Sequence, residues 1–135
     1  MTEGYIAVVI ELPNEDRVVR FRRVRCPAGD GASLKFLQKV VGGYIEHIGT
    51  PDGQYDYWVN EEGKLQGLRI NNCATDLLGT MWPDWRGWDV LCGNVVITGN
   101  KGPETVDAPE GLWEMLQRAE WLNRVEFVDE TEGEG

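Results

Sequence analysis

The sequence predicts an α+β fold, in which a mainly antiparallel sheet carries two principal helices and one short helix in a compact single domain. Three observations lead to this prediction. Residues 5–12 and 90–98 are strongly apolar runs of strand length, and residues 55–60 alternate in polarity. Apolar residues at helical spacing also recur between capping residues and glycines.

The chain begins with two predicted strands. Residues 5–12 form a β-branched apolar run, which is typical of a central strand covered on both faces. Residues 17–26 follow a polar turn and should return beside the first strand. The apolar positions of this second strand change phase between Phe21 and Val24. A β-bulge at that point would keep all of its apolar side chains on one face.

A helix and two more strands are expected next. Ser33 should cap a helix with one apolar face, and Gly42 with Gly43 should end it. Residues 44–48 and 55–60 are predicted to be strands, because each is short, partly β-branched or aromatic, and separated from the other by a glycine-rich turn.

The following segment should contain a hairpin and the short helix. Residues 60–63 are predicted to form the turn with Gly63 at positive φ, and residues 64–71 to return as a strand. Asn72 is a suitable cap for a helix over residues 73–78.

The last part of the chain should complete the sheet. Within the apolar strand 90–98, Gly93 and Asn94 indicate a bulge. Asp107 is expected to cap the final helix, and residues 125–128 should form a short edge strand.

The net charge limits the classes of partner. The 135 residues carry a formal charge of −10, whereas binding to nucleic acid or to an anionic membrane surface needs a basic face. We therefore expect no direct binding to nucleic acid. Residues 129–135 include four acids and should form a disordered acidic tail after a single globular domain at 1–128. The arginine-rich stretch 17–25 should pair with acidic turns and the tail, although a phosphate-binding patch is an alternative.

Cysteine content and hydropathy indicate a cytoplasmic protein. The three cysteines are odd in number and widely spaced, which argues against a disulfide framework. No apolar run has the length of a membrane span, and the N-terminus lacks the basic and apolar regions of a signal peptide.

Residues for covalent or metal chemistry are scarce. Ser33 is the only serine and His47 the only histidine, so a Ser–His–acid triad would have to use a helix cap as its nucleophile. Neither the spacing of zinc ligands nor a glycine-rich nucleotide loop is present. We expect no catalytic residue, no metal and no cofactor. An enzyme that uses Glu61 or Glu62 as a base is an alternative.

The polar stretch 60–75 is the best candidate for a binding site. It places amides, acids, a lysine and a threonine around two glycines and beside few core residues. An anion could be held by the amides, by the charge of Lys64 or Arg69, and by free N–H groups at the start of the following helix. The predicted ligand-binding residues are Asn60, Glu61, Glu62, Lys64, Asn71, Asn72, Thr75, Trp85 and Asn94. The alternative is that the stretch is only a turn followed by a helix cap.

Three tryptophans, Trp82, Trp85 and Trp88, lie within seven residues of one another. The indoles could bury a flap as a small satellite core. They could instead form an aromatic platform for a base, a sugar or a side chain of a partner. The sequence leaves both interpretations open.

Four short motifs occur in order along the chain. They are Val-Gly-Gly-Tyr-Ile-Glu at 41–46, Val-Asn-Glu-Glu-Gly-Lys-Leu at 59–65, Asn-Cys-Ala-Thr at 72–75 and Gly-Asn-Val-Val at 93–96. In these motifs the chain resembles the family called domain of unknown function 3846, which is common in bacteriophages, plasmids and actinobacterial genomes. The resemblance covers residues 5–98. It implies a phage or mobile-element origin and a cytoplasmic protein, and it brings no known activity.

The function that we expect is that of a non-enzymatic accessory protein that binds a small anionic or nucleotide-like ligand. The alternative partner is a host protein that contacts an acidic surface, in the extreme case by mimicry of DNA charge. A pocket joining Asn60, Lys64, Asn72 and Trp85 would favour the small ligand. A contiguous acidic face would favour the protein, and a carboxylate buried in a cleft would favour catalysis.

Overall fold

The computed structural model describes residues 4–131 of the chain and confirms the α+β class. Within these residues there are three α-helices, one 3-10 turn and seven strands. The strands are β1 (Tyr5–Ile10), β2 (Val18–Cys26), β3 (Ile45–Gly49), β4 (Asp56–Asn60), β5 (Val95–Lys101), β6 (Glu104–Val106) and β7 (Arg124–Asp129). The helices are α1 (Asp30–Val41), α2 (Asn72–Met81) and α3 (Leu112–Arg118), and the 3-10 turn η1 spans Pro83–Trp85.

Six of the strands lie side by side in the order β3-β4-β5-β1-β2-β7, and β6 pairs with β5. Every pairing is antiparallel except that of β2 with β7, which is parallel. The sheet is therefore mainly antiparallel, as predicted. β3 and β7 form its two edges.

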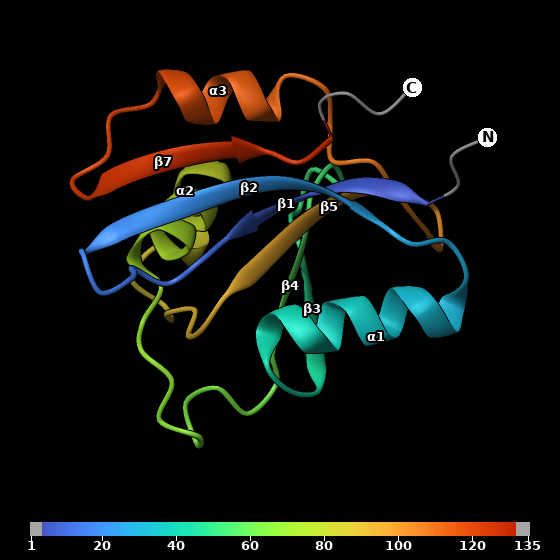
Figure 1. Ribbon diagram of the computed structural model, residues 1–135, viewed down its shortest axis with the longest axis horizontal. Helices are drawn as coiled ribbons and strands as arrows, with labels where there is room; N and C mark the ends of the chain where they lie inside the picture. Colours follow the sequence, from blue (N-terminus) through green and yellow to red (C-terminus); the bar gives the residue numbers. More distant parts are fainter. Residues whose placement is uncertain (1–3, 132–135) are drawn as a thin grey trace.

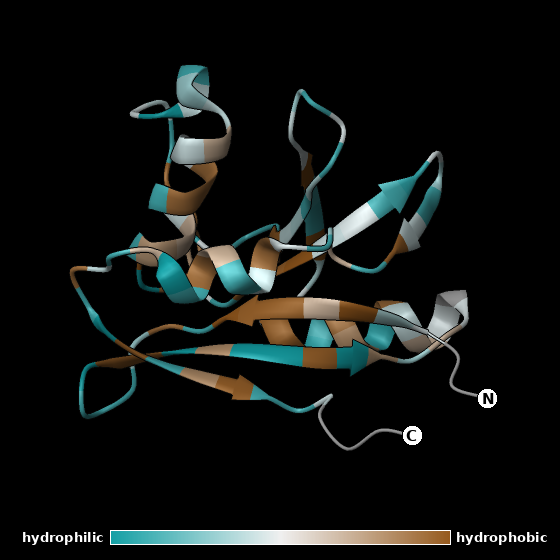
Figure 2. Cartoon of the chain, turned by 90° about the horizontal axis from the view of Figure 1, so that it is seen from above, coloured by the Kyte–Doolittle hydropathy of each residue, from teal (hydrophilic) through white to brown (hydrophobic). Residues whose placement is uncertain are grey.

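Helices cover both faces of the sheet (Figure 1). Leu37 and Val41 of α1 pack on one face, and apolar residues of α2 and α3 pack on the other. β1 lies in the middle, and its alternate residues contribute to the two cores. In Figure 2 this strand is brown along much of its length, which agrees with its burial on both faces.

The predicted bulge in β2 is wrong. β2 pairs with β1 one residue to one residue from Cys26 to Phe21, without an insertion. Side chains alternate regularly along such a strand. Phe21 therefore faces α2 and α3, whereas Val24 faces α1. The change of phase in the sequence reflects two covered faces rather than one.

Two predicted helix caps also differ. α1 begins at Asp30 after Gly29, so Ser33 lies inside the helix, and its Oγ is 2.6 Å from the hydroxyl of Tyr5. The predicted end of α1 is correct, because Gly42 adopts a left-handed conformation with φ 83°. Asp107 does not cap α3, because the residue before this helix is Gly111. The Oδ1 atom of Asp107 instead accepts a hydrogen bond of 2.7 Å from the backbone N–H of Ile6.

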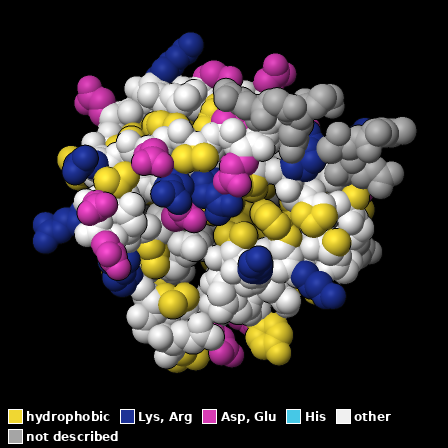
Figure 3. Space-filling view, in the orientation of Figure 1, with side chains coloured by type: hydrophobic (Ala, Val, Ile, Leu, Met, Phe, Trp, Pro, Cys, Tyr) yellow, Lys and Arg dark blue, Asp and Glu magenta, His cyan; other side chains and the backbone are white. Residues whose placement is uncertain are grey.

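The arginine-rich strand is paired with acids, as expected. Arg20 Nε lies 3.4 Å from Glu126 Oε1, and Arg22 Nε lies 2.6 Å from Glu130 Oε2. Arg23 Nη1 lies 3.4 Å from Asp129 Oδ2. Figure 3 shows basic and acidic side chains close together on this side of the molecule. A phosphate would have to displace these carboxylates, so the pairing favours a structural role for the arginines.

Residues 129–131 do not belong to the disordered tail that was expected over 129–135. Asp129 ends β7, and the backbone N–H of Glu130 donates a hydrogen bond of 2.8 Å to the carbonyl of Arg23. Asp129 Oδ1 also accepts a hydrogen bond from the N–H of Thr131. Residues 129–131 thus belong to the edge of the sheet, because the arginines of β2 supply their partners. Residues 132–135 lie outside the described residues.

Removal of residues 129–135 should lower the free energy of unfolding by about 1–2 kcal/mol, because it deletes Glu130 beside Arg22, Asp129 beside Arg23 and one backbone hydrogen bond, while Arg22 keeps its contact with Glu11. The matched control is a chain that ends after Thr131. Thermal unfolding followed by circular dichroism should show a Tm lower by about 3–8 °C for the shorter chain than for the control. Equal Tm values would mean that residues 129–131 contribute nothing to stability.

Candidate functional site

The polar stretch after β4 folds as a compact loop rather than as a hairpin. Residues 61–67 form consecutive turns, and Ile70 makes only an isolated bridge with Cys92. The predicted return strand 64–71 is therefore wrong. Positive φ occurs at Gly67 (72°) rather than at Gly63. Gly63 is needed for close packing instead, because a Cβ there would lie 3.3 Å from the Cβ of Cys92.

Asn60 fastens this loop to the end of α1. Its side chain is only 5 % exposed. Nδ2 donates to the carbonyl of Val41 at 3.2 Å and to Oε1 of Gln66 at 3.1 Å, while Oδ1 accepts from the N–H of Glu62 at 2.8 Å. All of these contacts are internal and use both N–H donors of the amide, so Asn60 shapes the loop.

Asn71, not Asn72, caps α2. Its side chain is 1 % exposed, and its Oδ1 accepts a hydrogen bond of 3.0 Å from the N–H of Ala74. Nδ2 donates to the carbonyls of Ile10 and Gly93, both at 2.9 Å. The cap therefore occupies the helix N-terminus at which an anion was expected to bind.

Thr75 and Asn94 have similar structural roles. Thr75 Oγ1 accepts a hydrogen bond of 3.0 Å from the N–H of Leu91. Asn94 Oδ1 accepts from the N–H of Leu12 at 2.9 Å, and its Nδ2 donates to the carbonyl of Val40 at 3.3 Å. Both side chains connect segments that are far apart in the sequence.

The tryptophan segment divides between core and surface. Trp85 in η1 is 8 % exposed and belongs to the core beneath α2 and α3, and Trp82 packs against that core. Trp88 is 82 % exposed. The first two indoles are therefore part of a main core rather than of a separate satellite core, and Trp88 is the exposed one of the three.

An acidic cleft opens beside the loop. We use this name for a cavity of about 290 Å³ between β3, the end of β4 and the segment before β5. Its charged lining residues are Glu46, Glu61, Glu62, Lys64 and Asp89, and the apolar ones include Ile48, Leu65 and Val90. Lys64 Nζ forms an ion pair with Asp89, which joins the two walls. This contact raises the pKa of Lys64 and lowers the pKa of Asp89, in each case mainly through their hydrogen bond.

The cleft carries an excess of negative charge. Four carboxylates and one lysine line it, and the lysine is already paired with Asp89. Glu46, Glu61 and Glu62 are exposed and make no ion pair with any residue in the described part of the chain. An anion in this cleft would meet like charges, whereas a cation would meet opposite ones.

Asn60 also lines this cleft, whereas the predicted residues Asn71, Asn72, Thr75, Trp85 and Asn94 do not. Asn72 lines a separate groove of about 590 Å³ between α2 and α3, together with Asp76 and Glu120. Trp85 is buried in the core beneath α2. The predicted common pocket for Asn60, Lys64, Asn72 and Trp85 is therefore absent from the described residues, because loop 61–67 and α2 present their side chains on different sides.

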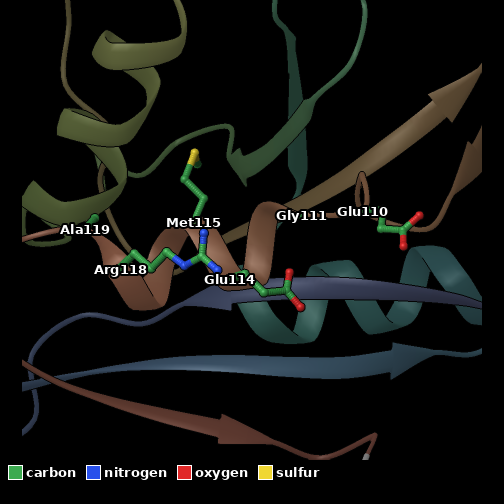
Figure 4. Close-up of a pocket in the computed structure, with 6 residues that line it drawn as sticks. All are labelled: Glu110, Gly111, Glu114, Met115, Arg118 and Ala119. Carbon is green, nitrogen blue, oxygen red and sulfur yellow. The ribbon is translucent and has the colours of Figure 1, made fainter.

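A shallow hollow of about 640 Å³ runs along α3 (Figure 4). It is lined by Glu110, Gly111, Glu114, Met115, Arg118 and Ala119. In Figure 4, Met115 and Glu110 point in different directions. The hollow has no set of polar groups that converge on one point, as a specific ligand site would require.

Reactive groups are few among residues 4–131. No group of three or more His, Cys, Asp or Glu side chains in this range is arranged to hold a metal. All three cysteines are free and buried, and burial raises the pKa of Cys73 to about 11. His47 is half-exposed, and its Nε2 lies 2.8 Å from Oδ1 of the buried Asp56.

Sequence reasoning found Asn60, Glu61, Glu62 and Lys64 in the cleft and missed Glu46, Leu65 and Asp89. Glu46 and Leu65 end two of the motifs, so their positions were visible in the sequence. Asp89 gave no local signal, because its role depends on contact with Lys64 across 25 positions of the chain.

Replacement of Asn71 by Ala should destabilise the protein by about 3 kcal/mol, because it removes a helix cap and leaves two buried carbonyls without their donor. The adjacent exposed Asn72 provides a matched control, and Asn72→Ala should change the free energy of unfolding by less than about 0.5 kcal/mol. Urea unfolding measures both. Equal effects would contradict the assignment of Asn71 as the cap.

Comparison with known proteins identifies the family of the chain. No curated protein and no solved structure matches it. No helix in residues 4–131 combines the length and apolar composition needed to cross a membrane. A family model described as "Domain of unknown function (DUF3846)" matches residues 6–120, which is most of the chain. That match agrees with the family expected from the sequence, and the chain belongs to the DUF3846 family.

Proposed function

We propose that the protein is a binding module whose acidic cleft receives a positively charged segment of a partner protein. The observation that carries this proposal is the charge of the cleft. Glu46, Glu61 and Glu62 surround a cavity whose one lysine is already paired. Complementary charge accelerates encounter with a basic partner and excludes acidic ones.

The apolar groups near the cleft favour a protein over a small cation. Leu65, which lines the cleft, is 88 % exposed, and Trp88, the neighbour of Asp89, is 82 % exposed. Large exposed apolar side chains beside charged ones are typical of the anchors of protein interfaces, and Trp is enriched among them. A metabolite of a few atoms would leave both side chains in water.

The same geometry gives less support to the other functions considered. A nucleotide would bring phosphates next to three unpaired carboxylates, and the indole of Trp85 is buried rather than free to stack. Glu61 and Glu62 are exposed, whereas a catalytic base at neutral pH usually needs burial or a close charge to raise its pKa.

The cellular setting is also a proposal. The resemblance of the four motifs to sequences common in phages, plasmids and actinobacteria supports an accessory protein of a phage or mobile element. The three buried free thiols are compatible with a reducing cytoplasm. In that setting the basic partner is a protein of the host cell.

Octalysine is a suitable first probe, with octaglutamate and ATP as controls. In two-dimensional NMR, octalysine should shift the amide signals of Glu46, Glu61, Glu62 and Asp89, and the shifts should weaken as salt is added. Binding of ATP to these residues, with no response to octalysine, would overturn the proposal in favour of an anionic ligand.

Charge substitutions provide the second part of the test. The double variant Glu46→Gln, Glu62→Gln should weaken octalysine binding by about three- to tenfold, because each exposed charge contributes about 0.5 kcal/mol or more. The double variant Glu110→Gln, Glu114→Gln removes the same charge along α3 and serves as the control. Equal weakening in isothermal titration calorimetry would point to net charge rather than to the cleft.

A further inference from the structure

We propose that the partner segment binds as an added β-strand along the free edge of β3, with basic side chains at alternate positions facing the acidic cleft. This inference rests on the proposed function, because the cleft supplies the charges that select the segment. It adds the mode of binding and the pattern of the bound sequence.

The hydrogen-bond pattern of β3 shows which of its groups face outward. At one end the N–H of Glu61 donates to the carbonyl of Tyr44 at 2.8 Å, and at the other the N–H of Thr50 donates to the carbonyl of Tyr55 at 3.0 Å. Hydrogen-bonded pairs alternate with non-bonded pairs in an antiparallel ladder. In the register of β3 with β4, Glu46 and Ile48 are therefore the bonded residues between these ends.

The remaining residues of β3 are Ile45, His47 and Gly49. Their N–H and C=O groups point away from β4, because they occupy the non-bonded pairs. β3 is the last strand on its side of the sheet, and no other described strand pairs with it there. It contains neither a proline nor a bulge, which are two of the devices that block pairing at an exposed edge.

The free edge lies directly beside the acidic cleft. The side chains of Glu46 and Ile48 line the cleft, and those of Ile45 and His47 lie on the opposite face. A strand placed about 4.8 Å from β3 would continue the same alternation. Every second side chain of the added strand would then stand next to Glu46 and Ile48.

The charges select the chemistry of this segment. Side chains on the cleft face would meet Glu46, Glu61 and Glu62, so Lys or Arg is favoured at those positions. On the other edge of the sheet, Glu126 and Asp129 of β7 are already paired with arginines of β2. A second copy of this chain fits β3 poorly, because it would bring two acidic clefts together.

An eight-residue peptide of alternating Lys and Val provides the probe. Two controls separate backbone pairing from charge: the same peptide with N-methyl groups on alternate residues, and spermine, a polycation without a peptide backbone. On addition of the unmodified peptide to the wild-type protein, the amides of Ile45, His47 and Gly49 should exchange with solvent more slowly. The N-methylated peptide and spermine should give no such protection.

A pair of substitutions tests the edge from the protein side. His47→Pro removes the outward N–H, and proline is tolerated on an edge strand where that group bonds to no neighbour. His47→Ala removes the same imidazole and keeps the N–H. The Kd for the alternating peptide should be about tenfold higher for His47→Pro than for His47→Ala. Circular dichroism establishes that both variants are folded, and the exchange experiment on the wild-type protein does not depend on them.

Each outcome separates the two proposals. Equal binding of the N-methylated peptide, or equal Kd values for the two His47 variants, would overturn strand addition while the acidic cleft kept its preference for cations. Failure of every cationic probe to bind at low salt would overturn the proposed function itself. A dimer in sedimentation experiments that is lost in His47→Pro would identify a second copy as the occupant and overturn the basic partner.

Discussion

A buried amide side chain, that of Asn71, connects the parts of the structure on which the cleft depends. It binds the end of β1 through the carbonyl of Ile10, the approach to β5 through the carbonyl of Gly93, and the start of α2 through the N–H of Ala74. The backbone N–H of Asn71 donates a hydrogen bond of 2.7 Å to the carbonyl of Leu91. A polar group at 1 % exposure is costly unless its hydrogen bonds are made. Here both amide hydrogens and the amide oxygen have partners, and these bonds hold β1, α2 and the segment before β5 together.

Buried or partly buried hydrogen bonds connect residues of the four sequence motifs to neighbouring segments. Asn60 binds the carbonyl of Val41, and Asn94 binds the carbonyl of Val40, so two motifs are fastened to the end of α1. Thr75 Oγ1 accepts a hydrogen bond from the N–H of Leu91, which lies just before β5. The amides and the threonine that look like ligand groups in the sequence therefore hold the walls of the cleft. The acids of the same motifs, Glu46 and Glu61, are exposed to solvent at the cleft.

The features that sequence reasoning predicted correctly are those set by local chemistry. The apolar run of β1 requires burial on both faces, and Gly42 adopts the left-handed conformation that ends α1. The errors concern residues whose conformation depends on distant partners. β2 looked bulged because the sequence does not show that a helix covers each face. The stretch 64–71 looked like a strand, yet its turns depend on Asn60 and on contact of Gly63 with Cys92. Asn72 was predicted as the cap of α2, but the cap is Asn71, whose side chain also binds the carbonyls of Ile10 and Gly93.

The parallel pairing of β2 with β7 has a consequence for how the protein is made. Val18 pairs with Arg124, so β2 leaves the ribosome long before its outer neighbour exists. During that interval its edge and the ring of Phe21, which contacts Phe127 and Trp121 in the finished fold, have no cover. The closure of such a long loop is entropically costly and slow. The nascent chain thus exposes the edge of β2 and the apolar ring of Phe21 until β7 is synthesised, and this interval is when it is most prone to aggregate or to need a chaperone.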